Sequence, residues 1–422
     1  MKKIFGTIIC IFMFGMGTIV QAQFIQSHYY EGNSSLTSDY VAGGVAVDTN
    51  NNKWFGTDQG VTKFDGATWT KYTLADGLPS LIISCIAVDK NNNVWIGTDG
   101  DGVAKFNGSA WTTYTSHSTN NGIDSLCDNG IRYIAGDING DIWFASAGSG
   151  VSKLSGSTWT TYRSGLPMDG GSIAGVNFIT VDALGNKWFG TSMGISKYDG
   201  STFTNIDQAS VDSLLDNNIF SIAIDASNNK WIGTQNGMTE LNSSNGWVKN
   251  YRKSNGLYNN AVQDIEIDAQ GKLWLGCYTD YNNDGGISRL AGTTWVSEQI
   301  DYPDSVSADQ IFRLAVDKNN DIWVAIDYGV IRIDHTSGIS EKYESGNLCV
   351  YPNPASDQLT VRFDNANGNK IQTIELYSTI QKVKEISVPE NSSVVTIPLN
   401  DLTNGLYFVK FGNITKKITI SR

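Results

Sequence analysis

A pair of residues, an aspartate followed six positions later by a tryptophan, recurs seven times along this chain. The aspartates are Asp48, Asp89, Asp137, Asp182, Asp225, Asp268 and Asp317, and the tryptophans are Trp54, Trp95, Trp143, Trp188, Trp231, Trp274 and Trp323. The remaining tryptophans also share one place, close to the end of a repeat. A spacing of about 41 to 49 residues is typical of proteins in which each repeat is one small supersecondary unit. This repeat therefore constrains the fold more than any other feature.

Each repeat divides into four short segments with the character of β-strands. In the first repeat they are Val45–Val47, Lys53–Thr57, Val61–Phe64 and Trp69–Tyr72. β-Branched and aromatic residues fill these segments, and turns rich in Asp, Asn and Gly separate them, as in antiparallel hairpins. Four-stranded sheets stacked around an axis leave only short edges exposed. We therefore expect an all-β fold in which residues 23–344 form a seven-bladed β-propeller.

The composition agrees with turn-rich antiparallel structure and argues against one class of partner. The chain has 44 glycines and a formal net charge of −12 at pH 7. Without a basic stripe that could follow a phosphate backbone, nucleic acid is not an expected partner. The negative charge favours neutral or cationic partners instead.

The N-terminus has the features of a secretory leader. Two lysines precede the apolar run Ile4–Val20, and Val20-Gln21-Ala22 resembles the small-residue motif at which a signal peptide is cleaved. We expect residues 1–22 to be a signal peptide, the alternative being an N-terminal membrane anchor, and we expect no other transmembrane span. An exported chain can form disulfides, but Cys85, Cys127, Cys277 and Cys349 occupy unrelated repeat positions, so their pairing stays open.

Polar connections on one face of the propeller are the candidate ligand site. The connection from each fourth strand to the next first strand shares a face with the turn between second and third strands, and binding residues usually lie on such loops. The alternative is a solvated rim, because Asn and Asp also form turns without any ligand. The candidates are Asp58, Asp99, Asp101, Asn129, Asn217, Asn260, Tyr278, Tyr281, Asp327 and Tyr328.

The sixth repeat has a longer turn between its second and third strands. Asp280, Asn282 and Asp284, followed by Gly285, match the opening of a calcium loop, D-x-N-x-D-G. The twelfth position of such a loop would be Ala291 instead of a bidentate glutamate, so the match is partial. Calcium is thus one hypothesis for this turn, and a longer turn capped by its own side chains is the other.

The repeat ends before residue 345, and a different β-rich module follows. Alternating segments at Gln358–Phe363, Ile371–Tyr377, Val394–Ile397, Leu406–Phe411 and Lys416–Ile420 suffice for a small Ig-like β-sandwich over residues 345–422. Two segments could complete the last blade of the propeller. Phe24–Tyr30 and Ile339–Tyr343 both have strand character, and the sequence does not choose between them.

The repeats resemble two-component regulator propeller repeats, the best copies being Val45–Gly66 and Ile86–Gly108. The third, sixth and seventh repeats depart from that pattern at the Gly-Thr pair. In sensor proteins with such propellers the ring is periplasmic and fused to a histidine kinase. This sequence has no kinase, so the resemblance implies the fold and leaves the ligand undefined.

The C-terminal module resembles the sorting domain of the type IX secretion system of Bacteroidetes. The matching residues are Tyr351–Pro354, Ile374–Tyr377, Leu402–Val409 and the basic pair Lys416-Lys417, with Gln381 standing where a glycine is usual. The resemblance implies that the secretion machinery is a partner of this module. It also implies that the protein is secreted or held at the outer-membrane surface of a Gram-negative bacterium.

Three functions remain open at this level. The first is a binding propeller for a carbohydrate, a peptide or a protein, with no catalytic residues. The second is an extracellular enzyme, because the repeats also resemble the streptogramin lyase scaffold, in which a histidine acts beside a metal; the candidates here are His28, His117 and His335, or a pair of loop carboxylates as in a glycosidase. The third is an adhesive or structural surface protein.

Overall fold

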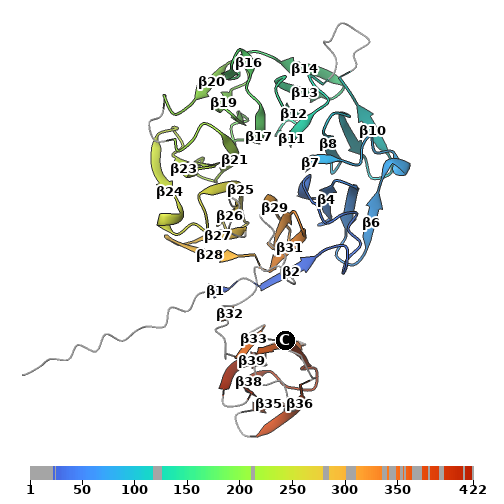
Figure 1. The fold of residues 1–422 in the computed structure, drawn as a ribbon, viewed down its shortest axis with the longest axis vertical. Coiled ribbons are helices and arrows are strands. Elements are labelled where there is room, and N and C mark those ends of the chain that lie inside the picture. The colour runs from blue at the N-terminus through green and yellow to red at the C-terminus, as the bar shows by residue number, and fades with distance from the viewer. Residues whose placement is uncertain are drawn as a thin grey trace, which may run out of the picture. The chain divides into compact units, whose positions relative to one another are not determined.

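The structure is a computed structural model in which seven four-stranded antiparallel sheets are arranged around a central axis (Figure 1). It describes residues 22–23, 25–116, 126–210, 214–278, 285–300, 310–334, 340–341, 348–351, 355, 358–363, 373–378, 381–388, 394–411 and 414–420. Within these residues the chain has no α-helix and only two short 3-10 turns, η1 (Leu74–Asp76) and η2 (Lys253–Asn255). The expected all-β, seven-bladed propeller is confirmed.

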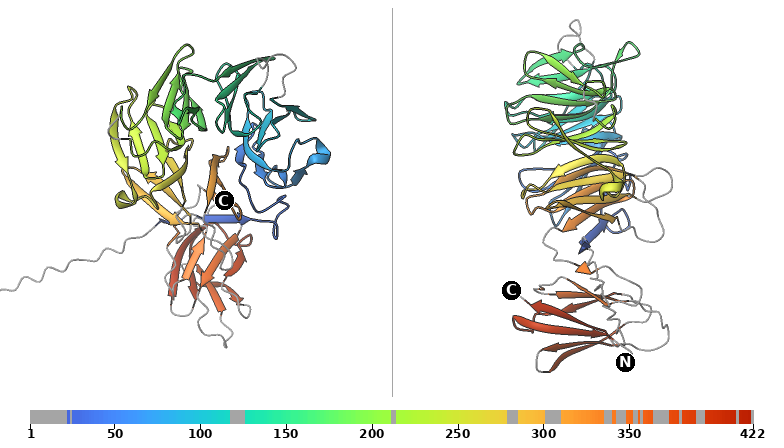
Figure 2. Two further views of the ribbon diagram at one scale, coloured as in Figure 1. Left: turned by 45° about the horizontal axis from the view of Figure 1, so that its top comes forward. Right: turned by 90° about the vertical axis from the view of Figure 1, so that its left-hand side faces the viewer.

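In each blade the strands follow one another along the chain from the innermost strand outwards (Figure 1). Figure 2 shows the same sheets tilted and from the side. Blades one to three are β3 (Gly44–Val47), β4 (Lys53–Thr57), β5 (Gly60–Phe64) and β6 (Trp69–Tyr72); β7 (Ile83–Val88), β8 (Val94–Thr98), β9 (Val103–Phe106) and β10 (Trp111–Tyr114); and β11 (Ile131–Gly136), β12 (Ile142–Ser146), β13 (Val151–Ser155) and β14 (Thr158–Tyr162). Blades four to six are β17 (Val176–Val181), β18 (Lys187–Thr191), β19 (Gly194–Tyr198) and β20 (Phe203–Ile206); β21 (Ile219–Ile224), β22 (Lys230–Thr234), β23 (Gly237–Leu241) and β24 (Trp247–Tyr251); and β25 (Ala261–Ile267), β26 (Leu273–Tyr278), β27 (Gly286–Ala291) and β28 (Thr294–Gln299). A small hairpin, β15 (Met168–Asp169) and β16 (Ser172–Ile173), lies between the third and fourth blades in sequence.

The repeated aspartate and tryptophan form one hydrogen-bonded unit in all seven blades. In the fourth blade, the Asp182 carboxylate accepts the indole N–H of Trp188 at 3.1 Å and the backbone N–H of Asn186 at 2.8 Å. The same indole-to-carboxylate bond recurs in every other blade, at 2.9 to 3.3 Å. A buried indole N–H needs such an acceptor. The spacing of six residues therefore reflects a turn that carries its own acceptor to the next strand.

The last blade contains β29 (Ile311–Val316), β30 (Ile322–Ile326) and β31 (Gly329–Asp334), and the N-terminal strand β2 (Ile25–Tyr29) completes it. Strand β2 pairs antiparallel with β31. The structure thus chooses between the two segments that the sequence left open. The segment near residue 340 is instead strand β32 (Ser340–Glu341), which pairs with β1 (Ala22–Gln23).

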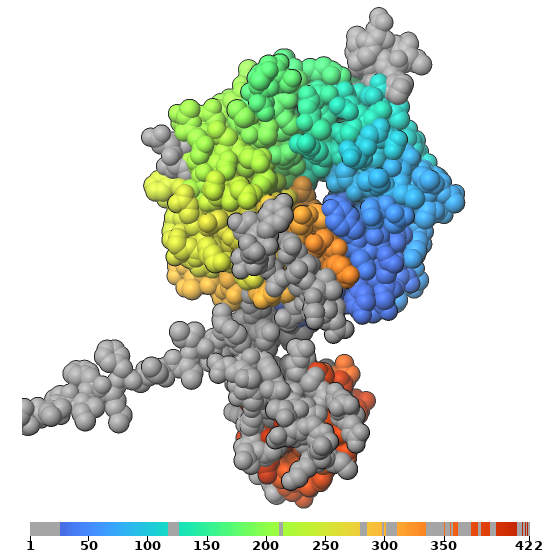
Figure 3. Space-filling view, in the orientation of Figure 1, coloured from blue at the N-terminus to red at the C-terminus, as the bar shows by residue number. Residues whose placement is uncertain are grey.

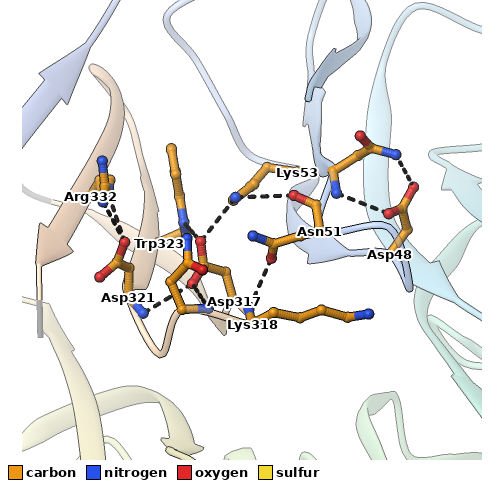
Figure 4. A network of polar contacts seen from close by, with 10 residues as sticks. Asp48, Asn51, Lys53, Asp317, Lys318, Asp321, Trp323 and Arg332 are labelled. Carbon is orange, nitrogen blue, oxygen red and sulfur yellow. Dashed lines mark hydrogen bonds and ion pairs between the residues drawn. The ribbon is translucent and has the colours of Figure 1, made fainter. Parts of the chain in front are cut away.

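A buried ion pair joins the last blade to the first (Figure 4). The Lys53 ammonium lies 2.9 Å from the Asp317 carboxylate, and both side chains are almost fully buried. Lys53 also lies over the Trp323 ring, 5.1 Å from its centroid, while Trp323 donates its indole N–H to Asp317 at 3.1 Å. Lys187 and Asp137 repeat the pair between the third and fourth blades, also at 2.9 Å.

The contacts divide the chain into two units, one formed by Phe24–Thr336 and the other by Met1–Gln23 with Ser337–Arg422. The second unit contains a sheet of β33 (Leu348–Tyr351), β34 (Gln358–Phe363) and β37 (Val394–Pro398), and a sheet of β36 (Lys382–Ser387), β35 (Thr373–Ser378), β38 (Gly405–Phe411) and β39 (Ile414–Ile420). Leu359, Leu376 and Val409 are among the residues of its common core. Two strands of the C-terminal module were not predicted from the sequence: β33, which includes Cys349, and β36, whose lysines and glutamate hide its alternation.

Candidate functional site

The first strand of each blade borders the centre of the ring (Figure 1). Six of these seven strands carry a β-bulge near their start. A bulge leaves one residue outside the ladder and redirects its side chain. The bulged residues are Ser84, Arg132, Asn177, Phe220, Gln263 and Phe312. All stand five positions before the repeated aspartate of their blade.

Five of these six bulged residues line a cavity of about 460 Å³, which we call the mouth. Its lining consists of Ser84, Arg132, Asn177, Ser192, Asn218, Phe220, Gln263 and Arg313. Asn218 lies in the connection that precedes β21, and Ser192 lies in the turn between β18 and β19. The mouth is therefore on the face that the sequence analysis selected. Figure 3 shows an opening at the centre of the ring.

Polar side chains of neighbouring blades form a chain of hydrogen bonds across the mouth. Arg132 donates to the Asn177 side-chain oxygen at 2.9 Å. Asn177 donates in turn to the Asn218 side-chain oxygen at 3.2 Å and to the backbone oxygen of Ile219 at 3.1 Å. Because these bonds cross three successive blades, the bulged side chains hold one another in place.

Arg313 lies on the axis side of β29 and lines a second cavity of about 270 Å³ as well as the mouth. Its guanidinium lies 5.1 Å from the ring centroid of Tyr133 and 5.5 Å from that of Phe178. Stacking of this kind orients a guanidinium and stabilises its charge. Arg313 thus joins the mouth to the interior of the channel.

Two carboxyl groups lie beside Arg313 in the second cavity, Asp264 and Glu266. Asp264 accepts the Ser221 hydroxyl at 2.9 Å and the Leu314 backbone N–H at 2.8 Å. Burial raises the pKa of Asp264, although the positive charge of Arg313 opposes that effect. Burial and the neighbouring Asp264 raise the pKa of Glu266 to about 8. Of these three groups, only Arg313 also lines the mouth.

Two glycines make room for the two arginines of the mouth. A Cβ atom on Gly44 would lie 2.7 Å from Cγ of Arg313, and one on Gly175 would lie 2.6 Å from a guanidinium nitrogen of Arg132. Any larger residue would displace these side chains. Gly44 also has φ of 80°, which a residue with a side chain rarely adopts.

Three of the predicted ligand residues hold their own connections. The side-chain oxygens of Asn129, Asn217 and Asn260 accept the backbone N–H groups of Ser116, Gln208 and Lys253, at 2.6, 2.8 and 2.8 Å. Each bond links the end of a fourth strand to the start of the next first strand. These amides therefore fix the loops that precede the bulges at Arg132, Phe220 and Gln263, which is the turn-forming role that the sequence analysis gave as the alternative.

The other predicted residues that the structure describes lie in turns around the mouth. Asp58, Asp327 and the exposed Tyr328 occupy turns between second and third strands, as do the exposed Asp99 and Asp101. Tyr278 ends β26, where its backbone oxygen accepts the Asn259 side chain at 3.0 Å. None of the predicted residues described lines the mouth.

Several expectations fall on residues outside the described ranges. Tyr281 and the calcium candidates Asp280, Asn282 and Asp284 are among them, as are His117 and His335. Among the described residues, no group of three or more His, Cys, Asp or Glu side chains is placed to hold a metal ion. His28 lies against the backbone oxygen of Tyr328 at 2.6 Å, and burial lowers its pKa. Cys85, Cys127 and Cys277 are buried free thiols.

The mouth residues were missed, although the sequence contains a signal for them. An apolar residue directly precedes the position five before each aspartate, while that position itself varies. Across the seven repeats it is Gly43, Ser84, Arg132, Asn177, Phe220, Gln263 and Phe312. A position that varies between repeats inside a regular apolar pattern is a candidate for a ligand contact.

Comparison with known families supports both resemblances. Residues 349–421 match the family described as secretion system C-terminal sorting domain, and residues 77–100 match two component regulator propeller. The chain therefore combines propeller repeats of that type with a sorting domain of the type IX secretion system. No curated protein matches the chain.

Solved structures share the fold at low sequence identity. A streptogramin B lyase is 16% identical with a TM-score of 0.57, and the match covers 73% of this chain and 97% of the lyase. PorZ, a surface component of the type IX secretion system of Porphyromonas gingivalis, is 16% identical with a TM-score of 0.54, over 91% of this chain. The extracellular domain of the one-component system BT4673 from B. thetaiotaomicron is 16% identical with a TM-score of 0.56, over 94% of this chain. The chain spans 60% of PorZ and 58% of the BT4673 domain.

The sorting domain determines the destination of the protein. Such a domain implies export to the exterior or to the outer-membrane surface, with the secretion machinery as the partner. Within the described residues, no helix is both long enough and apolar enough to cross a membrane.

Proposed function

We propose that this protein is an exported binding module that recognises a small polar ligand, a carbohydrate or a peptide, at the mouth of its central channel. The observation that supports this proposal is the convergence of five bulged side chains from five different blades on one cavity. Bulges often redirect side chains next to functional sites. A volume of about 460 Å³ is in the usual range for sites that take small molecules.

The chemistry of the mouth suits binding through several weak contacts. The amides of Asn177, Asn218 and Gln263 can both donate and accept hydrogen bonds, as hydroxyl or peptide groups require. Phe220 adds an apolar ring among them, half-buried at the start of β21. A mainly polar lining with one aromatic ring suits a ligand rich in hydroxyl or peptide groups.

The rigidity of the mouth also favours binding. Arg132, Asn177 and Asn218 are held by bonds between blades, and the loops before three of the bulges are fixed by Asn129, Asn217 and Asn260. A site that is ordered before the ligand arrives loses less conformational entropy on binding. Three of the residues expected from the sequence thus fix the loops beside the mouth, and the bulged residues contact the ligand.

The test is a ligand screen on the full chain by thermal shift, with oligosaccharides and peptides, because a ligand that binds only the folded state raises the melting temperature. For any ligand found, Phe220→Ala combined with Gln263→Ala should weaken binding by roughly tenfold or more. The control is Leu184→Ala, an exposed apolar residue on the turn at the opposite face. Equal loss in the control, or no loss in the double variant, would place the ligand elsewhere.

A further inference from the structure

The mouth differs in charge from the rest of the protein. The chain has a net charge of −12, with 42 acidic against 30 basic side chains. Yet the residues that line the mouth include two arginines, Arg132 and Arg313, and no acidic residue. Two guanidinium groups at one opening favour an anionic group there, while the carboxyl groups of Asp264 and Glu266 line the second cavity and not the mouth.

Arg313 keeps hydrogen-bonding capacity that the described residues do not use. One terminal nitrogen of its guanidinium, Nη1, is buried and has no hydrogen-bond partner there. The neighbouring Asp264 accepts its hydrogen bonds from Ser221 and Leu314. A buried N–H group left without an acceptor is unfavourable, and a ligand oxygen would remove that cost.

Arg132 offers a second guanidinium to the same cavity. It is exposed, and of its five N–H donors one is engaged with Asn177. Gly175 leaves the space in which this guanidinium lies. A guanidinium fork matches the two oxygens of a carboxylate, and such charged hydrogen bonds are stronger than neutral ones.

We propose that the mouth binds a ligand through its carboxylate, held between Arg132 and Arg313, and that this ligand is an acidic sugar. The inference rests on the proposed function and narrows its ligand class. The ring of Phe220 provides an apolar surface for the carbon face of a sugar ring. The amides of Asn177, Asn218 and Gln263 suit the hydroxyl groups around it.

The experiment is titration calorimetry on the full chain with oligomers of galacturonic or glucuronic acid and their neutral galactose and glucose counterparts. A third pair of probes is a short peptide with a free C-terminal carboxylate and the same peptide amidated. We expect the acidic sugars to bind and the neutral ones to bind at least roughly tenfold more weakly, since a charged hydrogen bond is lost.

The variants make the assignment specific to the mouth. Arg132→Ala should weaken binding of the acidic sugar by roughly ten- to a hundredfold, and Arg132→Lys by less, because lysine keeps the charge without the fork. The matched control is Arg252→Ala, an exposed arginine in a connection on the same face that does not line the mouth. The melting temperatures of the free variants show whether each is folded.

The outcomes separate this inference from the function on which it rests. Neutral sugars that bind as tightly as acidic ones would overturn the carboxylate contact and leave the binding function standing. Binding of the free peptide but not of acidic sugars would overturn the sugar. An effect of Arg252→Ala equal to that of Arg132→Ala would overturn the assignment to the mouth. Binding of none of these probes, with no hit in the wider screen, would overturn both proposals.

Discussion

Replacing Lys53 by methionine should affect the stability of the propeller far less than replacing its partner Asp317 by asparagine. The two side chains form the buried ion pair between the last and first blades, 5% and 1% exposed (Figure 4). Moving two charges out of water costs several kcal/mol, and the attraction between them offsets only about that amount. An apolar replacement of similar length therefore changes the balance little, whereas removing the carboxylate leaves a buried ammonium without its counter-charge.

The ring itself contains the comparison. At the corresponding position of four other blades the lysine is replaced by an apolar residue, namely Val94, Ile142, Leu273 or Ile322. In the first blade Asp48, which has no lysine of this kind beside it, accepts the N–H groups of Asn50, Asn52 and Trp54. Asp317 accepts the equivalent bonds from Asn319, Asp321 and Trp323. Hydrogen bonds alone therefore satisfy this carboxylate once the lysine is gone.

The expected magnitudes are distinct enough to measure. Lys53→Met should change the free energy of unfolding by no more than about 1 kcal/mol, and Asp317→Asn should lower it by about 3 to 5 kcal/mol. For a unit of about 310 residues this corresponds to a decrease of roughly 5 to 8 °C in the melting temperature of the propeller. Scanning calorimetry of the full chain resolves that transition.

The pH dependence gives an independent check. Burial alone would raise the pKa of Asp317, but the hydrogen bonds from Lys53 and Trp323 outweigh it, so the pKa lies below its ordinary value. The stabilisation by this carboxylate is present above the pKa of the unfolded chain and is lost as the pH falls through the lower, folded value. The difference between the wild type and Asp317→Asn should therefore shrink below about pH 4. Equal destabilisation by both variants at pH 7 would refute the argument from desolvation.

Three further predictions use the same assay. Glu266→Gln should flatten the pH dependence of stability. A pKa of about 8 means that the folded state keeps a proton which the unfolded chain loses near pH 4.5, so the free energy of unfolding falls as the pH rises between those values. An unchanged slope would contradict this. Trp188→Phe should lower the free energy of unfolding by about 1 to 3 kcal/mol, because Asp182 loses its indole donor. Trp247→Phe, at a half-exposed indole, should lower it hardly at all. Equal losses would show that the bond to Asp182 does not matter. Deleting residues 25–29 should lower the melting temperature more than any of these substitutions, since it opens the ring at β31, and an unchanged melting temperature would mean that another segment closes the blade.

The repeat and the turns were readable from the sequence because their causes are local. The turn that begins with Asp182 supplies the hydrogen-bond acceptor for Trp188 in the next strand, so the spacing of six residues is kept in every blade. The alternation of the strands, the signature of the sorting domain and the face that carries the connections follow from equally short stretches of chain. Seven copies of one such unit leave few folds other than a closed ring.

The strand that closes the ring and the residues of the mouth were decided by tertiary structure. Strand β2 reaches β31 across almost the whole propeller sequence, and no local pattern distinguishes it from a competing segment. Likewise Arg132 and Arg313 lie far apart in the chain and line one cavity only because a bulge redirects the first and closure of the ring brings the second to the same opening. Local hydrogen bonding thus determined the blades, whereas the site depends on side-chain directions and distances that exist only after the blades have assembled.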